Sequence, residues 1–169
     1  MGKKLSRSLA IVILILLAVA AVGYFFYKGN QQNYTVSETN VGSISAKPKA
    51  LAGKETKYLK FSQDEYEKAL KEKKIIFLDF YANWCPICRA EEPNLKAGFN
   101  SLKTDKIIGF RVNWGDSDTD EDEKKLAQEF GVVHQTAKII LKDGKPVFGP
   151  EIVDWDKDML VKALTQYIQ

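Results

Sequence analysis

The sequence predicts an α/β domain, with a central mixed sheet flanked by helices, that follows one N-terminal transmembrane helix. Three observations predict this organisation: an uncharged stretch near the N-terminus, two apolar segments typical of buried strands, and amphipathic segments that alternate with them. A chain of 169 residues is long enough for one ordinary domain and an appendage. We therefore expect a single compact domain attached to a membrane.

The segment before the domain has the features of a membrane anchor. Lys3, Lys4 and Arg7 precede residues 9–27, which are 19 residues without a charge. As a helix this stretch would rise roughly 28 Å, which is enough to cross a bilayer. The positive-inside rule then places residues 1–8 in the cytoplasm and the rest of the chain on the extracytoplasmic side of the cell membrane.

A cleavable signal peptide is the alternative, because Ala18-Val19-Ala20 offers a cleavage site and cleavage would leave a secreted or periplasmic protein. We favour the uncleaved anchor, because the apolar run continues through the aromatic residues 24–27, which suit a membrane interface. Four of the 25 basic residues and none of the 22 acidic residues lie in the first 28 positions. The basic balance of the chain therefore comes from the flanks of the anchor, which excludes a basic nucleic-acid-binding surface on the domain.

Residues 28–56 are rich in Asn, Gln, Ser, Thr, Gly and Lys, with few large apolar side chains. Such a composition cannot bury enough apolar surface to offset the entropy of ordering, so we expect a flexible linker. A short strand within the linker is left open. The domain is expected to extend over residues 57–169.

Strand and helix signals follow one another along the domain. The expected elements are a strand over 57–61, a helix from 62 to about 74, a strand over 75–80, a helix from 85 to about 102, a strand over 106–113, a helix from 119 to about 131, a strand over 137–141, an edge strand over 146–148 and a helix over 156–168.

In the first half, Ser62 and Glu65 form a capping-box pattern that predicts the start of the first helix. Residues 75–80 are apolar apart from Asp79, as expected of a central strand buried on both faces. The next helix contains Pro93, where the missing N–H and the ring should produce a kink.

In the second half, the acidic run 116–123 departs from a calcium-binding loop, because Glu121 stands where that loop needs glycine. We interpret it as the start of a helix that Thr119 caps and that Gly131 ends. Residues 142–145 predict a hairpin turn, and the final segment is amphipathic.

Both cysteines of the chain lie two residues apart, directly after the predicted strand 75–80 and at the start of the next helix. The unpaired N–H groups of a helix N-terminus favour a thiolate at the first sulfur, so we interpret an exposed Cys85 as the nucleophile and Cys88 as the resolving thiol. A static disulfide and half of a zinc site are the alternatives. A zinc site would need two further ligands, and the chain has one histidine, His134, and no third cysteine.

Asp79 is the one charge in an otherwise apolar strand. Burial disfavours the ionised carboxyl and should raise its pKa, which would make Asp79 a usable base near neutral pH. We therefore expect Asp79 to accept the proton of Cys88, and we expect Asp79→Asn to stabilise the fold while slowing that step.

The domain resembles the thioredoxin family. The resemblance rests on the block from Asp79 to Cys88, on Pro93 five residues after the second cysteine, and on Gly131-Val132 with the Asp143-Gly144 turn. The anchor and the Arg89-to-Pro93 continuation are similar to membrane-tethered extracytoplasmic members, such as those of cytochrome c maturation, and the motif is similar to the C-terminal domain of transmembrane disulfide reductases.

This resemblance implies a thioredoxin fold and an extracytoplasmic thiol-disulfide oxidoreductase that needs no cofactor and no metal. It implies protein substrates with thiols or disulfides, a transmembrane electron donor as a further partner, and no nucleic acid. The implied catalytic residues are Cys85, Cys88 and Asp79. The implied substrate-binding residues are Trp84, Pro86, Ile87, Gln135 and Thr136.

Thr136 departs from the family pattern, because it stands where the family carries a cis-proline. The cis or trans state of the Gln135-Thr136 peptide stays open, and a hydroxyl at this position could bond a thiolate. We expect Thr136→Pro to leave a folded, redox-active domain with altered partners.

Pro86 and Ile87 differ from the dipeptides of the strongest family reductants and oxidants. Because Ile87 offers no donor side chain, we expect a moderately lowered pKa for Cys85, and hence a reductase or isomerase more than a strong oxidant. The alternative function is a non-enzymatic metal-binding or copper-delivery module that uses Cys85, Cys88 and His134.

Overall fold

The computed structural model of the protein describes residues 48–168. The cytoplasmic segment 1–8, the anchor 9–27 and most of the linker 28–56, as the sequence predicts them, lie outside the described residues. Among the helices of residues 48–168, none is long and apolar enough to span a bilayer. The elements are β1 Ala50–Ala52, β2 Lys57–Lys60, α2 Gln63–Lys71, β3 Ile75–Tyr81, α3 Pro86–Ser101, β4 Ile107–Asn113, α4 Glu121–Glu129, β5 Ala137–Lys142, β6 Lys145–Ile152 and α5 Lys157–Thr165.

The strands form one mixed sheet with the order β1-β2-β4-β3-β5-β6. Strand β3 pairs in parallel with β4 and antiparallel with β5, while β2 pairs in parallel with the other side of β4. The short edge strand β1 pairs antiparallel with β2 and lies in the segment that the sequence predicts to be linker. The mixed sheet confirms the α/β domain of the predicted fold class, whereas the predicted transmembrane helix lies outside the described residues.

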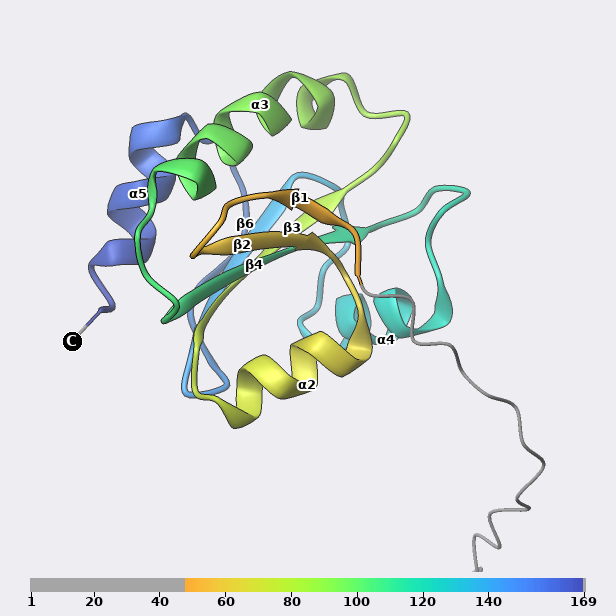
Figure 1. The fold of residues 1–169 in the computed structure, drawn as a ribbon. Coiled ribbons are helices and arrows are strands. Elements are labelled where there is room, and N and C mark those ends of the chain that lie inside the picture. The colour runs from red at the N-terminus through yellow and green to blue at the C-terminus, as the bar shows by residue number, and fades with distance from the viewer. Residues whose placement is uncertain (1–47, 169) are drawn as a thin grey trace, which may run out of the picture. The chain divides into compact units, whose positions relative to one another are not determined.

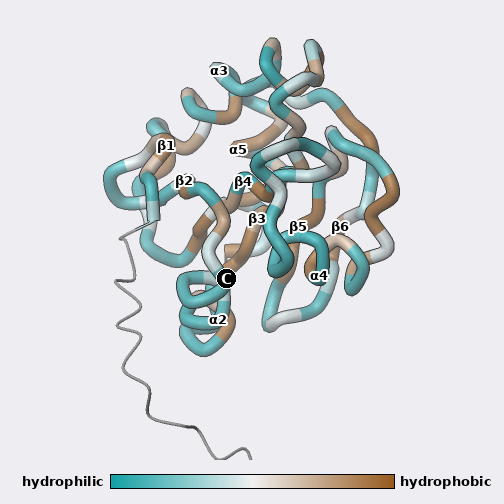
Figure 2. Tube along the Cα trace, turned by 90° about the vertical axis from the view of Figure 1, so that its right-hand side faces the viewer, coloured by the Kyte–Doolittle hydropathy of each residue, from teal (hydrophilic) through white to brown (hydrophobic). Residues whose placement is uncertain are grey.

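Two helices cover each face of the sheet, as Figure 1 shows with α3 and α5 above the strands and α2 and α4 below them. Beneath α3 and α5, one cluster joins Leu95, Phe99 and Leu160 to Phe77 of the sheet. On the opposite face, a second cluster includes side chains of α2 and α4. In Figure 2 the hydrophobic colour follows the inner strands, whereas α2 is mostly hydrophilic. Burial of these two apolar layers holds the helices on the sheet.

Strand β3 occupies a central position, and all seven of its residues are buried. Its apolar composition fits this place, because both of its faces are covered by helices. The strand ends at Tyr81, and only four residues separate it from α3. Both cysteines therefore lie where the central strand passes into a helix.

Helix α3 begins with Cys85 as N-cap and Pro86 in the first turn, and it contains Pro93 as predicted. Gly98 allows this helix to approach α5, because a Cβ atom there would lie 2.6 Å from Leu160 Cδ2. The close contact fixes α3 over the sheet and thereby fixes the position of its N-terminus.

The predicted start of α2 at Ser62 is confirmed, but its capping hydrogen bond and the predicted cap of α4 are wrong. Ser62 is the N-cap of α2, but its side chain makes no capping hydrogen bond. Helix α4 is capped by Asp120 and not by Thr119, since Asp120 and Glu123 form a reciprocal capping box. Thr119 bonds instead within the preceding loop, where its hydroxyl donates to Asp116 at 2.9 Å. Strand β6 is also longer than the predicted segment 146–148.

Candidate active site

The two cysteines lie together at the N-terminus of α3 as free thiols. The sulfur of Cys85 accepts a hydrogen bond from the backbone N–H of Cys88 at 3.2 Å. This bond uses one of the N–H groups that a helix N-terminus leaves without an intrahelical partner. The local sequence produces the geometry, because Pro86 suits the first helical turn and needs no N–H partner there.

Cys85 is buried, with 2% of its surface exposed, so the prediction that it is exposed is wrong. Its neighbours in the chain are exposed instead, with 51% exposure at Trp84 and 56% at Ile87. Val133, from the loop before β5, is a third exposed apolar side chain. Apolar side chains next to a covered sulfur can pack against an incoming partner.

The two thiols have opposite pKa shifts. Burial by itself raises the pKa of the Cys85 thiol, but hydrogen bonds from Cys88, Thr136 and Ile87 outweigh burial and lower it below its ordinary value. Burial raises the pKa of the Cys88 thiol, and its hydrogen bond with Cys85 adds to that increase. Cys85 is therefore the thiol that ionises first, which suits an attacking sulfur.

Thr136 contacts both sulfurs from the loop before β5. Its Oγ1 atom lies 3.8 Å from the Sγ atom of Cys85 and 3.4 Å from that of Cys88. A hydroxyl can donate to one sulfur while it accepts from the other. Thr136 therefore lies beside the dithiol, as its place in the sequence predicts.

The backbone at Thr136 is unusual for a β-branched residue. Its φ angle is 68°, in the left-handed region, and its N–H donates to the Phe80 carbonyl at 2.7 Å. In the described chain the Gln135-Thr136 peptide is not among the cis bonds, which resolves the question that the sequence left open. Proline has neither the N–H nor access to this φ angle. Thr136→Pro would therefore lose the bond to Phe80 and change the backbone of this loop, while a folded, redox-active domain with altered partners stays a prediction for this variant.

A loop after β4 holds the residues that precede Cys85. The indole of Trp84 donates to the Gly115 carbonyl at 3.0 Å. The backbone N–H of Asn83 donates to Asp116 Oδ2 at 2.7 Å, and its side chain donates to Ser117 at 3.1 Å. These contacts fix Trp84 at the rim of the dithiol, with its ring half exposed.

Two predicted site residues, His134 and Gln135, directly precede Thr136 in the chain. His134 is exposed, and its ring lies 6.3 Å from the ring of Trp114. Gln135 is partly exposed and directly precedes Thr136. Within residues 48–168 no three His, Cys, Asp or Glu side chains form a group that could hold a metal ion. The structure therefore does not bring His134 and the two cysteines together as a ligand set.

Asp79 is buried below the dithiol and has two partners that sequence reasoning missed. Its Oδ1 atom lies 2.8 Å from the Nζ atom of Lys138, and its Oδ2 atom accepts a hydrogen bond from the Tyr58 hydroxyl at 2.6 Å. The Tyr58 ring stacks on Phe99 of α3, with 4.8 Å between ring centroids. Asp79 is therefore not an isolated acid in an apolar strand, because a buried ammonium compensates its charge.

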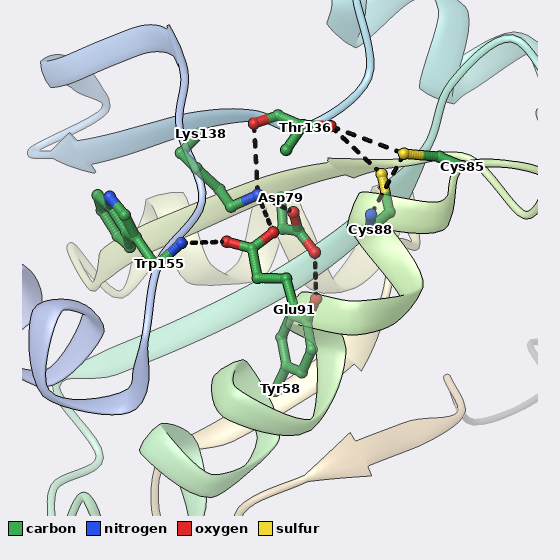
Figure 3. A network of polar contacts seen from close by, with 8 residues as sticks. All are labelled: Tyr58, Asp79, Cys85, Cys88, Glu91, Thr136, Lys138 and Trp155. Carbon is green, nitrogen blue, oxygen red and sulfur yellow. Dashed lines mark hydrogen bonds and ion pairs between the residues drawn. The ribbon is translucent and has the colours of Figure 1, made fainter.

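Glu91 completes this network from α3, as Figure 3 shows. Its Oε2 atom lies 2.8 Å from Lys138 Nζ, and its Oε1 atom accepts the backbone N–H of Trp155 at 2.7 Å. Burial raises the pKa of the Glu91 carboxyl, Lys138 opposes this increase, and Asp79 adds to it. A sequence signal for the network existed, since Lys138 is a charge inside the apolar run Ala137–Leu141, as Asp79 is inside its own strand.

A second ion pair lies beside the first under α3. Arg111 Nη1 of β4 lies 2.8 Å from Glu92 Oε1, and the guanidinium lies 4.5 Å from the centroid of the Tyr81 ring. Consecutive glutamates of α3 are thus each bound by a cation from the sheet, one from β4 and one from β5. The N-terminal half of the helix is held by charges and its C-terminal half by apolar contacts.

Comparisons with known proteins identify the family of the domain. The sequence profile of the family described as Thioredoxin matches residues 57–166. The thiol:disulfide interchange protein HelX of Rhodobacter capsulatus is 33% identical over 110 residues, which are 62% of this chain and 53% of HelX. The chain thus spans about half the length of this relative. Thioredoxin of Malassezia sympodialis is 26% identical over 63% of this chain and 93% of its own length.

Solved structures show the same fold. Thioredoxin O2 of Arabidopsis thaliana, in its oxidised state, superposes with a TM-score of 0.51 at 19% identity, over 70% of this chain and 100% of that one. A mutant thioredoxin of Halobacterium salinarum superposes with a TM-score of 0.50 at 23% identity, over 66% of this chain and 89% of that one.

Proposed function

The chain belongs to the thioredoxin family and its domain is a thiol-disulfide oxidoreductase, and we propose that the whole protein exchanges disulfides with protein partners on the extracytoplasmic side of a membrane. The observation that carries the proposal is the placement of Cys85 at the N-terminus of α3, where its sulfur accepts the N–H of Cys88. Cys85 then acts as the nucleophile and Cys88 as the resolving thiol.

The exchange proceeds in two balanced steps. The Cys85 thiolate attacks one sulfur of a partner disulfide, so that a mixed disulfide forms and the other partner sulfur leaves as a thiolate. Cys88 then loses its proton and attacks the Cys85 sulfur. The mixed disulfide breaks, the second partner sulfur leaves as a thiolate, and the Cys85–Cys88 disulfide remains. Two electrons have passed from this chain to the partner.

Asp79 is the proposed proton acceptor for Cys88 in the second step. Its carboxylate lies in the buried layer directly behind the dithiol, where Lys138 holds it (Figure 3). Such a position gives the proton a destination inside the domain while the partner covers the site. The exposed side chains of Trp84 and Ile87, with Pro86, form the proposed contact surface for the partner, and Gln135 and Thr136 border it from the opposite loop.

The environment of Cys85 favours a reductase or isomerase over a strong oxidant. The largest effects that lower the pKa of Cys85 are hydrogen bonds from Cys88, from the Thr136 hydroxyl and from the backbone of Ile87, and none of these comes from a basic side chain. The nearest cation in sequence, Arg89, donates instead to the Asn83 carbonyl at 2.7 Å. A thiolate without such an ion pair is stabilised less in the reduced protein, which makes the disulfide a weaker oxidant.

Reduction of a protein disulfide tests the proposed activity. The full-length chain in detergent micelles, kept reduced by dithiothreitol, should accelerate the reduction of insulin disulfides, whereas the Cys85→Ser variant should not. Equal rates for the two proteins would refute the proposed activity. The midpoint potential of the dithiol, measured against glutathione, should lie nearer to those of thioredoxins and isomerases than to the most oxidising potentials of the family.

The proposed location is supported by the uncharged segment 9–27 and by Lys3, Lys4 and Arg7 before it. An extracytoplasmic domain would receive its electrons from a donor in the membrane. Protease added to spheroplasts should degrade the domain while the membrane is intact. Protection of the domain until the membrane is lysed would contradict the location and leave the activity standing.

A further inference from the structure

A fully buried lysine lies between two buried carboxylates beneath α3, and neither chemical step of the proposed exchange uses it. Lys138 has 0% of its surface exposed, and its Nζ atom lies 2.8 Å from both Asp79 and Glu91. The same nitrogen lies 3.4 Å from the Thr136 carbonyl, two residues earlier in the chain. Lysine is among the residues least often fully buried, and it is buried only when it is paired. We call Asp79, Lys138 and Glu91 the acid–lysine unit.

The acid–lysine unit has one negative charge more than it has positive charges when both acids are ionised. Its neighbours do not remove this excess. Tyr58 of β2 is a neutral donor, Trp155 before α5 contributes a backbone N–H, and Arg111 of β4 is paired with Glu92 of α3. A buried excess charge is unfavourable, so the unit gains a favourable proton-binding site.

The unit is connected with the dithiol by two chain segments. Glu91 follows Cys88 by three residues on α3, so the two side chains lie on the same side of the helix. On β5, Lys138 binds the carbonyl of Thr136, whose hydroxyl contacts both sulfurs. Figure 3 shows the unit and the two cysteines in one network of polar contacts that Thr136 joins.

We propose that Lys138 is a positioning residue that joins Asp79 and Glu91 into one proton-exchange unit, and that the net charge of this unit sets the pH range in which Cys88 resolves the mixed disulfide. The inference rests on the proposed function and deepens it. The proton of Cys88 passes to one of the two carboxylates and makes the unit neutral. The Cys88 thiolate attacks Cys85, the partner sulfur leaves, and that sulfur takes the proton from the unit.

Two substitutions change the charge of the unit in opposite directions. Lys138→Met removes the cation, so the two remaining acids share a proton up to a higher pH and accept the proton of Cys88 less readily until that shared proton is lost. Glu91→Gln leaves Asp79 paired with Lys138, so the unit is neutral and binds a proton more weakly. The raised pKa of Glu91 agrees with a unit that already binds protons more readily than a free carboxylate.

The test is the pH dependence of resolution in single turnovers. Reduced full-length protein in micelles reacts with a labelled disulfide protein, and acid quenching separates the mixed disulfide from the final product at each pH. Lys138→Met should move the midpoint of the resolution rate upward by about one pH unit or more, and Glu91→Gln should move it downward. The double variant should lie between the two single variants, and it keeps the test usable if the first variant folds poorly.

Lys142→Met is the matched control, because it removes a lysine at the other end of β5, outside the unit. Its midpoint should equal that of the wild type. Opposite shifts of the two unit variants would support the inference, since loss of packing would move both in the same direction. Unchanged midpoints, or shifts of the same sign, would overturn it. If the wild type formed no mixed disulfide, the proposed function would fail instead.

Discussion

The hydroxyl oxygen of Thr136 lies 3.4 Å from the sulfur of Cys88, although 48 residues separate them in the chain. The contact is possible because Thr136 has a left-handed backbone, with φ at 68°, that the hydrogen bond to Phe80 holds in place. The same oxygen lies 3.8 Å from the sulfur of Cys85. The Thr136 side chain therefore contacts both the attacking and the resolving thiol, and its hydroxyl can stabilise the thiolate of either.

Thr136→Val should raise the pKa of Cys85, because the valine has the shape of threonine but no hydroxyl to bond the thiolate. A hydrogen bond to a charged group contributes about 1.5–3 kcal/mol, which corresponds to roughly one pH unit or more. The ultraviolet absorbance of the thiolate, followed during a pH titration, measures this change. Thr136→Ser retains the hydroxyl and serves as control; equal Cys85 pKa values in both variants would contradict the assigned contact.

Cys88→Ser should accumulate mixed disulfides with partner proteins, because Cys85 still attacks but no second thiol resolves the product. Cys85→Ser should accumulate far fewer, since burial raises the pKa of the remaining Cys88 thiol. Non-reducing electrophoresis after acid quenching distinguishes the two variants. Equal trapping by both would show that the two roles are wrongly assigned.

Asp79→Asn should lower the free energy of unfolding by about 1–3 kcal/mol, in contrast to the gain expected from the sequence alone. Asp79 accepts from the Tyr58 hydroxyl with one oxygen and binds Lys138 with the other. Asparagine has one oxygen, so one buried donor loses its acceptor.

Tyr58→Phe supplies the matched control, because it removes the donor and leaves Lys138 with both acids. Urea denaturation of the two single variants and the double variant gives their coupling free energy. The double variant should be more stable than the sum of the single effects predicts. Strictly additive effects, or an Asp79→Asn variant more stable than the wild type, would show that the hydrogen bond between Tyr58 and Asp79 does not stabilise the fold.

Glu123→Gln should destabilise the protein less at neutral pH than at acidic pH. Burial raises the pKa of Glu123 above its ordinary value of 4.5, although hydrogen bonds from Asn113 and Asp120 oppose this. The folded state therefore binds this proton more strongly than the unfolded state, and the contribution of Glu123 to stability falls as pH rises from 4.5 towards the raised value.

Glutamine has no such titration, but it cannot replace both carboxylate oxygens, which accept from Asn113 at 2.7 Å and from Asp120 at 3.0 Å. The overall loss should be about 1–3 kcal/mol. Urea denaturation across this pH range measures the difference between the variant and the wild type. A loss that grows as pH rises would contradict the raised pKa.

The sequence by itself determined the order and the type of the elements. Periodicity and apolar runs identified the sheet strands of the domain, including the buried strand β3 and the charge within it. The spacing of Cys85 and Cys88, together with Pro86 at the start of the helix, located the dithiol at the N-terminus of α3. These signals are local, because the residues that create them are neighbours in the chain.

Only the tertiary structure decided the surroundings of the dithiol. Cys85 was expected to be exposed, but its neighbours turn outward while its own sulfur faces Thr136. The cap of α4 also differs from the prediction, because Asp120 and Thr119 both offer a capping oxygen and the fold of the loop selects Asp120. Local composition does not distinguish such alternatives.

The largest difference between the sequence prediction and the structure concerns the buried charges. Asp79 is recognisable in the sequence as a charge in an apolar strand. Its direct partners are Tyr58 of β2 and Lys138 of β5, and Lys138 also binds Glu91 of α3. Pairing of β3 with β5 aligns Asp79 directly with Lys138, and the packing of α3 adds the second acid. The register of paired strands and the position of a packed helix are set by the whole core, so the electrostatic environment of the site exists only in the folded protein.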